Sequence, residues 1–152
     1  MDVIILLSKV IPGDTMVGSG SFTHTWSGFE SHCPAAFKQL WDDTDFTDVT
    51  LALEDGSLLK AHKVILSSSS QLFRQLLVQN PHASPLICLM GVQSRQLKAI
   101  LSYIYRGHCE MLEEEKDLFM ATGKLLMIEG LMGEMKTDDE KVEKIEQLED
   151  AT

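Results

Sequence analysis

The chain has 152 residues, 44% of them hydrophobic and 24% charged, and a formal net charge of −10. This length and composition suit one globular domain with a core and terminal extensions. The negative charge argues against direct nucleic-acid binding, because phosphate contacts need clustered Lys and Arg. Three cysteines without a CxxC pair indicate reduced thiols rather than a disulfide framework.

The first segment, residues 1–21, is punctuated by Gly and Ser and is predicted to be a flexible N-terminal arm. Its apolar run, Val3 to Leu7, is too short to span a membrane, and Asp2 stands where a signal peptide would carry positive charge. We therefore expect no membrane partner. Further on, the apolar spacing predicts an amphipathic helix around residues 35–41, with Pro34 in its first turn.

Residues 49–53 alternate apolar and smaller or polar side chains, which predicts a strand. Asp55 and Gly56 are a strong hairpin signal, because a type I′ turn needs positive φ at both central residues. If they form a two-residue loop, Asp48 faces Lys63 across the open end of the hairpin. A single bulge would change that register.

The next apolar residues recur every four positions, which predicts one helix over residues 62–77 with small side chains in its middle. The stripe consists of Val64, Ile65, Ser68, Ser69, Leu72, Phe73, Leu76 and Leu77. The serines at 67–70 are also compatible with a polar turn. A loop and a short strand over residues 86–90 follow.

The spacing of apolar residues predicts a further helix beginning at Ser94, its N-cap, and ending at Gly107. Residues 108–112 are expected to be a short strand. The last predicted helix opens with three glutamates at 113–115 and contains Gly123, which costs about 1 kcal/mol relative to Ala unless close packing requires it. Residues 133–152 are acidic and are expected to be disordered rather than to form a short charged helix.

No phosphate-binding, zinc-protease or nucleophile-elbow motif occurs in the sequence. His32–Cys33 and His108–Cys109 are poor metal sites, because adjacent side chains in a strand point to opposite faces. His62 is interpreted as a packed, hydrogen-bonded histidine, since no nucleophile or carboxylate pattern accompanies it. We expect no enzyme activity, no catalytic residue, no cofactor and no metal.

The predicted order is helix, hairpin, helix, strand, helix, strand, helix, an α+β plan with clustered helices and a small sheet. Four segments occur in series: FTDVTL (46–51), KAHKVILSSSSQLF (60–73), LSYIYRG (101–107) and LMIEGL (126–131). Over residues 22–132 the chain resembles a BTB/POZ domain. The segments FTHTWSGFESH and NPHASP resemble the insect tramtrack-like subgroup.

The resemblance implies a BTB/POZ fold, a cluster of helices flanked by a small mixed β-sheet, in a dimer that exchanges a strand at residues 21–26. The dimer-forming helices would cover residues 29–41 and 62–77, and the tramtrack-like group also assembles beyond dimers. The interface residues implied are Phe22, Trp26, Phe29, Phe37, Leu40, Val64, Ser68, Ser69 and Leu72. Asp48, Lys63 and His62 would form a charged pocket at the dimer groove, either functional or a plain structural pair.

The function implied is a non-enzymatic interaction module of a nuclear transcription regulator. It would form homo-oligomers, form hetero-oligomers with other BTB proteins and recruit a partner such as a corepressor; no DNA-binding region is recognisable in this chain. The alternative is an adaptor of a cullin-type ubiquitin ligase, although residues 79–85 lack the acidic contact residue often found there. Nuclear residence rests on the resemblance alone, with the cytoplasm as the alternative.

Overall fold

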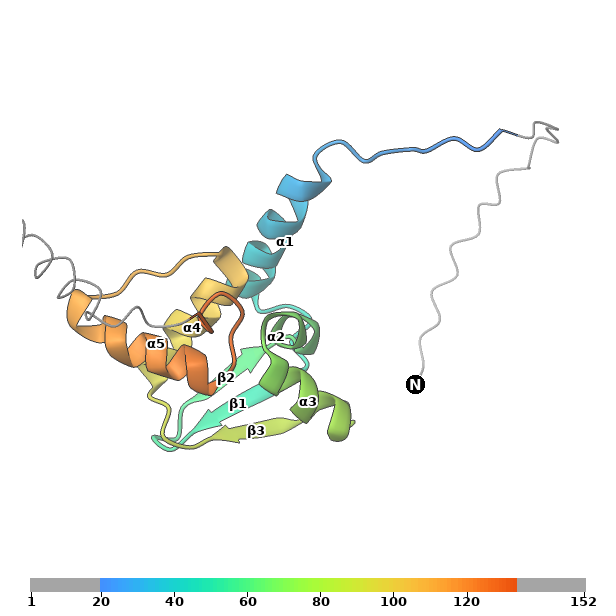
Figure 1. Cartoon of the computed structure of the whole chain (residues 1–152). Coiled ribbons are helices and arrows are strands. Elements are labelled where there is room, and N and C mark those ends of the chain that lie inside the picture. The colour runs from blue at the N-terminus through green and yellow to red at the C-terminus, as the bar shows by residue number, and fades with distance from the viewer. Residues whose placement is uncertain (1–19, 134–152) are drawn as a thin grey trace, which may run out of the picture.

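A three-stranded sheet lies against a cluster of helices in the computed structural model, which describes residues 20–133 (Figure 1). Among these residues the elements are α1 (Phe29–Asp43), β1 (Val49–Leu53), β2 (Leu58–Ala61), α2 (Lys63–Ser69), α3 (Gln71–Gln79), β3 (Leu86–Leu89), α4 (Ser94–Arg106), the 3₁₀ helix η1 (Glu113–Glu115) and α5 (Lys116–Leu125). The predicted α+β class is confirmed. Most of the predicted N-terminal arm and of the acidic tail lies outside the described residues.

The sheet has the order β2-β1-β3, with β1 antiparallel to β2 and parallel to β3, so it is mixed as expected. The predicted hairpin register was wrong by one residue, because Val49 pairs with Ala61 and Leu51 with Leu59. The hairpin loop has three residues. The N–H of Gly56 donates to the carbonyl of Leu53 (3.0 Å), and Gly56 itself has a left-handed backbone with φ 83°. A turn followed by a left-handed Gly adds one residue relative to a two-residue loop.

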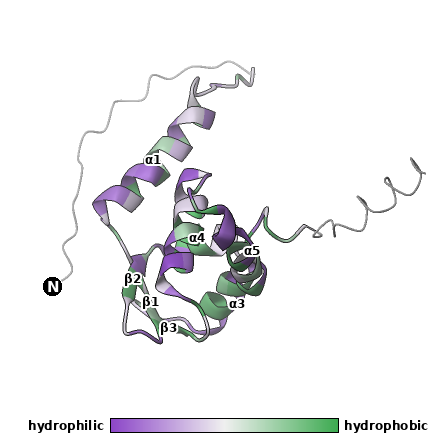
Figure 2. Ribbon diagram, turned by 90° about the vertical axis from the view of Figure 1, so that its left-hand side faces the viewer, coloured by the Kyte–Doolittle hydropathy of each residue, from purple (hydrophilic) through white to green (hydrophobic). Residues whose placement is uncertain are grey.

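The core lies between one face of the sheet and the helices α2 to α5. Alternate residues of β1 point into it, and Leu51 is fully buried. Its largest fully buried side chains are Tyr105, Phe73, Leu51, Leu66, Leu97, Ile100, Leu101, Leu126 and Ile128. Figure 2 shows hydrophobic residues on α3 and α5. Within residues 20–133, no helix combines the length and apolarity needed to cross a membrane.

The single helix predicted over residues 62–77 is two helices, α2 and α3, which meet at Ser70. Ser70 is extended (φ −145°, ψ 122°), and its hydroxyl accepts the N–H of Phe73 (3.1 Å) and donates to the carbonyl of Leu126 (2.6 Å). Ser70 therefore ends α2, caps α3 and ties both helices to the end of α5. The predicted stripe is therefore divided between two helices and does not form one continuous face; Phe73 is buried in the core, whereas Val64 is exposed.

Three further boundaries differ from the predictions. α1 begins at Phe29 and not near residue 35, because Gly28 in the left-handed region starts the helix and Pro34 lies inside it. Ser94 is the first residue of α4 and Gln93 its N-cap, while Gly107 ends the helix as predicted. Residues 108–112 form no strand, since no neighbouring strand among the described residues pairs with them.

Gly123 supports a prediction about packing between α5 and the segment after it. A Cβ at this position would lie 2.5 Å from Cδ1 of Leu131, so Gly123→Ala should lower the free energy of unfolding by about 1–3 kcal/mol, as overpacking does. Helix propensity alone would raise it. Urea denaturation measures the sign, with Gly133→Ala as the control because a Cβ there meets nothing within 4 Å. A Gly123→Ala variant as stable as the wild type would contradict this packing.

Candidate functional site

α1 projects from the domain and has no fully buried side chain, although Leu40 and Trp41 near its end pack against the core (Figure 1). Its last turn alone is held: Trp41 packs against Tyr105 with ring centroids 4.9 Å apart, and Asp42 Oδ1 pairs with an Arg106 nitrogen at 2.5 Å. The N-terminal half of α1, which begins at Phe29, exposes apolar side chains to solvent. Large exposed apolar residues on one element are typical of a surface that binds another protein.

Most of the predicted interface residues are accessible in the single chain. Phe22 (88% exposed), Trp26, Phe29, Phe37, Val64 (74%) and Ser68 are exposed, whereas Leu40, Ser69 and Leu72 are half-buried. The structure brings Trp26 and Phe29 together, with ring centroids 5.3 Å apart. Residues 20–26 form no helix or strand. The dimer contact and the strand exchange therefore stay predictions.

Phe46 was missed at the sequence level. It is 86% exposed and has φ 59°, a left-handed conformation that is uncommon for a bulky side chain and is often found at functional sites. The available signal was an aromatic residue in the polar stretch DDTDF directly before a strand. Phe46 and Val64 lie on two segments that meet, because the carboxylate of Asp48 accepts the N–H of Lys63 at 2.8 Å.

The predicted charged pocket is held by main-chain contacts. Asp48 binds the first N–H of α2, which is one of the N–H groups that a helix start leaves unsatisfied. The ammonium group of Lys63 donates to the carbonyl oxygens of His82 and Ala83. Among the described residues Asp48 and Lys63 form no salt bridge with each other, so the predicted side-chain pairing across the hairpin was wrong. A partner-binding role for this pocket stays a prediction.

His62 is buried and fully hydrogen-bonded. Its main-chain N–H donates to the Tyr105 hydroxyl (2.9 Å), the hydroxyl donates to Nδ1 (2.7 Å), and Nε2 donates to the carbonyl of Asp45 (2.5 Å). This arrangement fits the neutral tautomer with its hydrogen on Nε2. Burial raises the pKa of Tyr105 to about 12. His62 and Tyr105 thereby fix the loop that carries Phe46 against α4.

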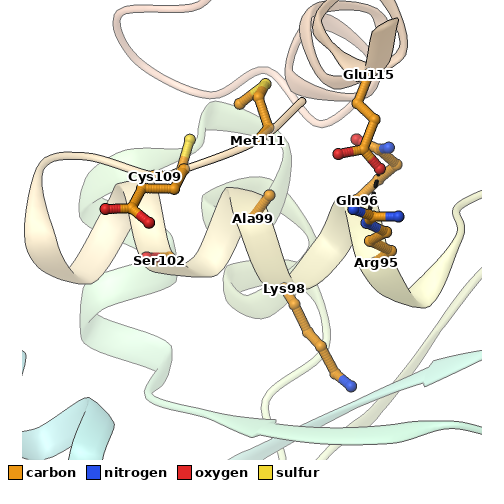
Figure 3. A pocket seen from close by; sticks show the side chains of 9 residues that line it. Arg95, Gln96, Lys98, Ala99, Ser102, Cys109, Met111 and Glu115 are labelled. Carbon is orange, nitrogen blue, oxygen red and sulfur yellow. Dashed lines mark ion pairs between the residues drawn. The ribbon is translucent and has the colours of Figure 1, made fainter. Parts of the chain in front are cut away.

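A groove of about 240 Å³ lies between α4 and residues 109–111 (Figure 3). Cys109 and Met111 lie on one side and Ala99 on the other, and Arg95 pairs with Glu115 at one end (2.7 Å). Burial raises the pKa of the Cys109 thiol, which keeps it in its less nucleophilic protonated form. No cluster of three metal-ligating side chains occurs in residues 20–133.

A family model for the BTB/POZ domain matches residues 37–141. The chain belongs to the BTB/POZ family. BTB/POZ domains are protein-interaction modules, and oligomerisation is a known property of the family. The resemblance inferred from the sequence is thereby confirmed.

Curated relatives from Drosophila melanogaster match this BTB domain. It is 38% identical to Longitudinals lacking protein-like over 76% of the chain and 91% of that protein. It is 37% identical to Broad-complex core protein isoforms 1/2/3/4/5 over 77% of the chain and 36% identical to tramtrack, alpha isoform, over 76% of the chain. The matches cover only 16% and 14% of those two proteins.

Two solved structures share the fold. The BTB domain of zebrafish PATZ1 has a TM-score of 0.62 and 19% identity, covering 84% of this chain and 99% of that one. The BTB domain of human gigaxonin has a TM-score of 0.61 and 25% identity, covering 73% of this chain and 93% of that one.

The His62–Tyr105 contact predicts a stability loss in Tyr105→Phe. This change leaves the N–H and Nδ1 of His62 without a partner inside the core, which costs about 1–3 kcal/mol. Tyr103→Phe is the matched control, since its hydroxyl has no hydrogen bond within residues 20–133. Chemical denaturation of both variants measures the difference, and equal stabilities would contradict the network.

The pH dependence of the stability of Tyr105→Phe is a second measurement. The pKa of Tyr105 in the folded chain, about 12, lies above the usual tyrosine value of 10.0, so its contribution to stability is complete below pH 10. It is lost as pH rises from 10 towards 12, because the unfolded chain releases the phenol proton first. The wild type should therefore lose more stability across this window than Tyr105→Phe does.

Proposed function

We propose that this BTB domain associates with a second copy through α1, the Phe46 loop and the start of α2. The observation that carries the proposal is a fifteen-residue helix with no fully buried side chain. Apolar residues at Phe29, Phe37, Phe46 and Val64 remain in water. Their burial in a dimer would contribute about 25 cal/mol for each Å² removed from water.

The two segments that lack a strand partner support exchange of residues 21–26 between copies. Residues 21–26 are exposed, and residues 108–112 of the same chain have no strand beside them in the described part. A strand supplied by a second copy would satisfy main-chain groups of both segments. The groove beside Cys109 and Met111 would receive side chains of the incoming strand.

The tramtrack-like resemblance and the Drosophila relatives support a role in a nuclear regulator of transcription. In this role the domain would form homo-oligomers and hetero-oligomers with other BTB proteins and recruit a corepressor. The loop NPHASP carries no acidic residue, which favours this role over that of a cullin adaptor. A pull-down that returned a stoichiometric cullin complex would contradict the assignment.

Val64→Glu tests the proposed dimer contact. A carboxylate buried without a partner in an interface is strongly unfavourable, so the dissociation constant should rise at least about 100-fold, or roughly 3 kcal/mol. Val78→Glu is the matched control, because Val78 is equally exposed (73%) and lies beyond the residues of the predicted interface. Sedimentation equilibrium measures the dissociation constants of both variants. Equal constants would show that Val64 does not lie in the dimer contact.

Truncation tests the role of the leading segment. A chain that starts at Phe29 should still dimerise through α1, but more weakly, and should lose assembly beyond the dimer, since it lacks the exchanged residues 21–26 with Phe22 and Trp26. A chain that lacks only residues 1–20 should retain the higher assembly. Light scattering gives the masses. Higher assembly that persists without residues 1–28 would contradict a role for the exchanged strand.

A further inference from the structure

A buried glutamine of α4 has no hydrogen-bond partner among the described residues. Gln96 is 4% exposed, and its side-chain amide forms no hydrogen bond within residues 20–133. No fully enclosed side-chain nitrogen or oxygen in this part of the chain lacks a partner, so the amide atoms of Gln96 reach the wall of the groove between α4 and residues 109–111. Buried polar side chains are nearly always hydrogen-bonded, so this amide indicates a ligand that enters the groove.

The groove beside Gln96 has room for small side chains. Gln96, Ala99 and Ser102 recur every three residues along α4 and line one wall. The short side chains of Ala99 and Ser102 leave a space of about 240 Å³ open. Figure 3 shows Gln96 together with Arg95 and Glu115 at one end of this space. A primary amide offers both donors and an acceptor, so it can bind a hydroxyl group, which is also both.

The segment that precedes α1 carries hydroxyl groups at alternate positions. Residues 21–26 read Ser-Phe-Thr-His-Thr-Trp and are exposed. The ring of Trp26 packs against Phe29 and His32 of its own chain, with ring centroids 5.3 and 4.9 Å apart. Successive side chains of an extended segment point to opposite sides, so the hydroxyl-bearing side chains face away from the side on which Trp26 packs.

This segment and the groove lie apart in a single chain. The last turn of α1 is held against α4 by the contact between Trp41 and Tyr105. From Trp41 back to Phe29 the helix rises roughly 18 Å. Residues 20–26 continue away from the domain beyond that end (Figure 1). The segment is therefore placed to meet the groove of a second copy rather than its own.

We propose that Gln96 recognises residues 21–26 of a second copy by hydrogen bonding to the hydroxyl group of Thr23. Thr25 is set aside because it lines a hollow beside Phe29 of its own chain. The inference rests on the proposed dimer and adds to it a residue that selects the partner. A segment with an apolar side chain in place of Thr23 would leave the buried amide unpaired, which weakens the wrong pairing.

Gln96→Leu in the full chain tests the contact, because leucine is similar in size and removes the amide. The dissociation constant should rise about tenfold, since the Thr23 hydroxyl loses its partner inside the interface. Gln93→Leu is the matched control, because Gln93 is exposed and its side chain does not cap α4. Sedimentation of fluorescently labelled chains from nanomolar to micromolar concentration gives the constants.

Thr23→Val identifies the partner of the amide. It should raise the dissociation constant as much as Gln96→Leu does, and the double variant should be little weaker than either single variant, because both changes remove the same hydrogen bond. Thr25→Val should dissociate as the wild type does. Additive effects of Gln96→Leu and Thr23→Val, or no effect of Thr23→Val, would overturn the proposal.

Two further results separate this contact from the dimer itself. A wild type that dimerises as strongly as Gln96→Leu would overturn the role of Gln96 and leave the dimer intact, whereas a wild type that stays monomeric would contradict both. Hydrogen exchange of the core amides of α4 should be equal in wild type and Gln96→Leu. Faster exchange in the variant would mean that the amide holds its own chain together, and the recognition role would be overturned.

Discussion

The exposed apolar surface formed by α1, Phe46 and Val64 is the constraint on which the proposed function depends. A helix of fifteen residues is only marginally stable by itself, and α1 has no fully buried side chain. Its last turn is fixed by Trp41 and by the Asp42–Arg106 pair, whereas its first half is mostly exposed and is contacted by the exposed Trp26. A second copy that covers this surface would hold the helix in place and remove its aromatic residues from water.

The polar residues behind this surface hold its loop and helices in position. Asp48 binds the N-terminus of α2, Lys63 holds the loop before β3, and His62 joins the Phe46 loop to Tyr105 in α4. These groups lie beside an apolar unit because main-chain N–H and C=O groups at helix starts and loops need partners. They determine the geometry of the loop and helix that would meet a partner, whether or not they contact the partner themselves.

The periodicity of the sequence was sufficient to predict β1 and α4 and the α+β class, because each element has one clearly apolar face. The hairpin register was not predictable, since Asp55-Gly56 fits both a two-residue and a three-residue loop. The break at Ser70 depends in part on the carbonyl of Leu126, 56 positions away, and the local signal, the serines at 67–70, fits both a continuous helix and a polar turn. Phe46 was missed for a related reason: its exposure and its left-handed backbone are set by tertiary contacts of the loop.

The molar mass of the full chain in solution tests the self-association most directly. Sedimentation equilibrium at micromolar concentration should give at least twice the 17.0 kDa of one chain, with the α-helical signal of a folded domain. A folded species that stays at 17.0 kDa at every concentration would mean that α1, Phe46 and Val64 remain in water, and self-association would be contradicted.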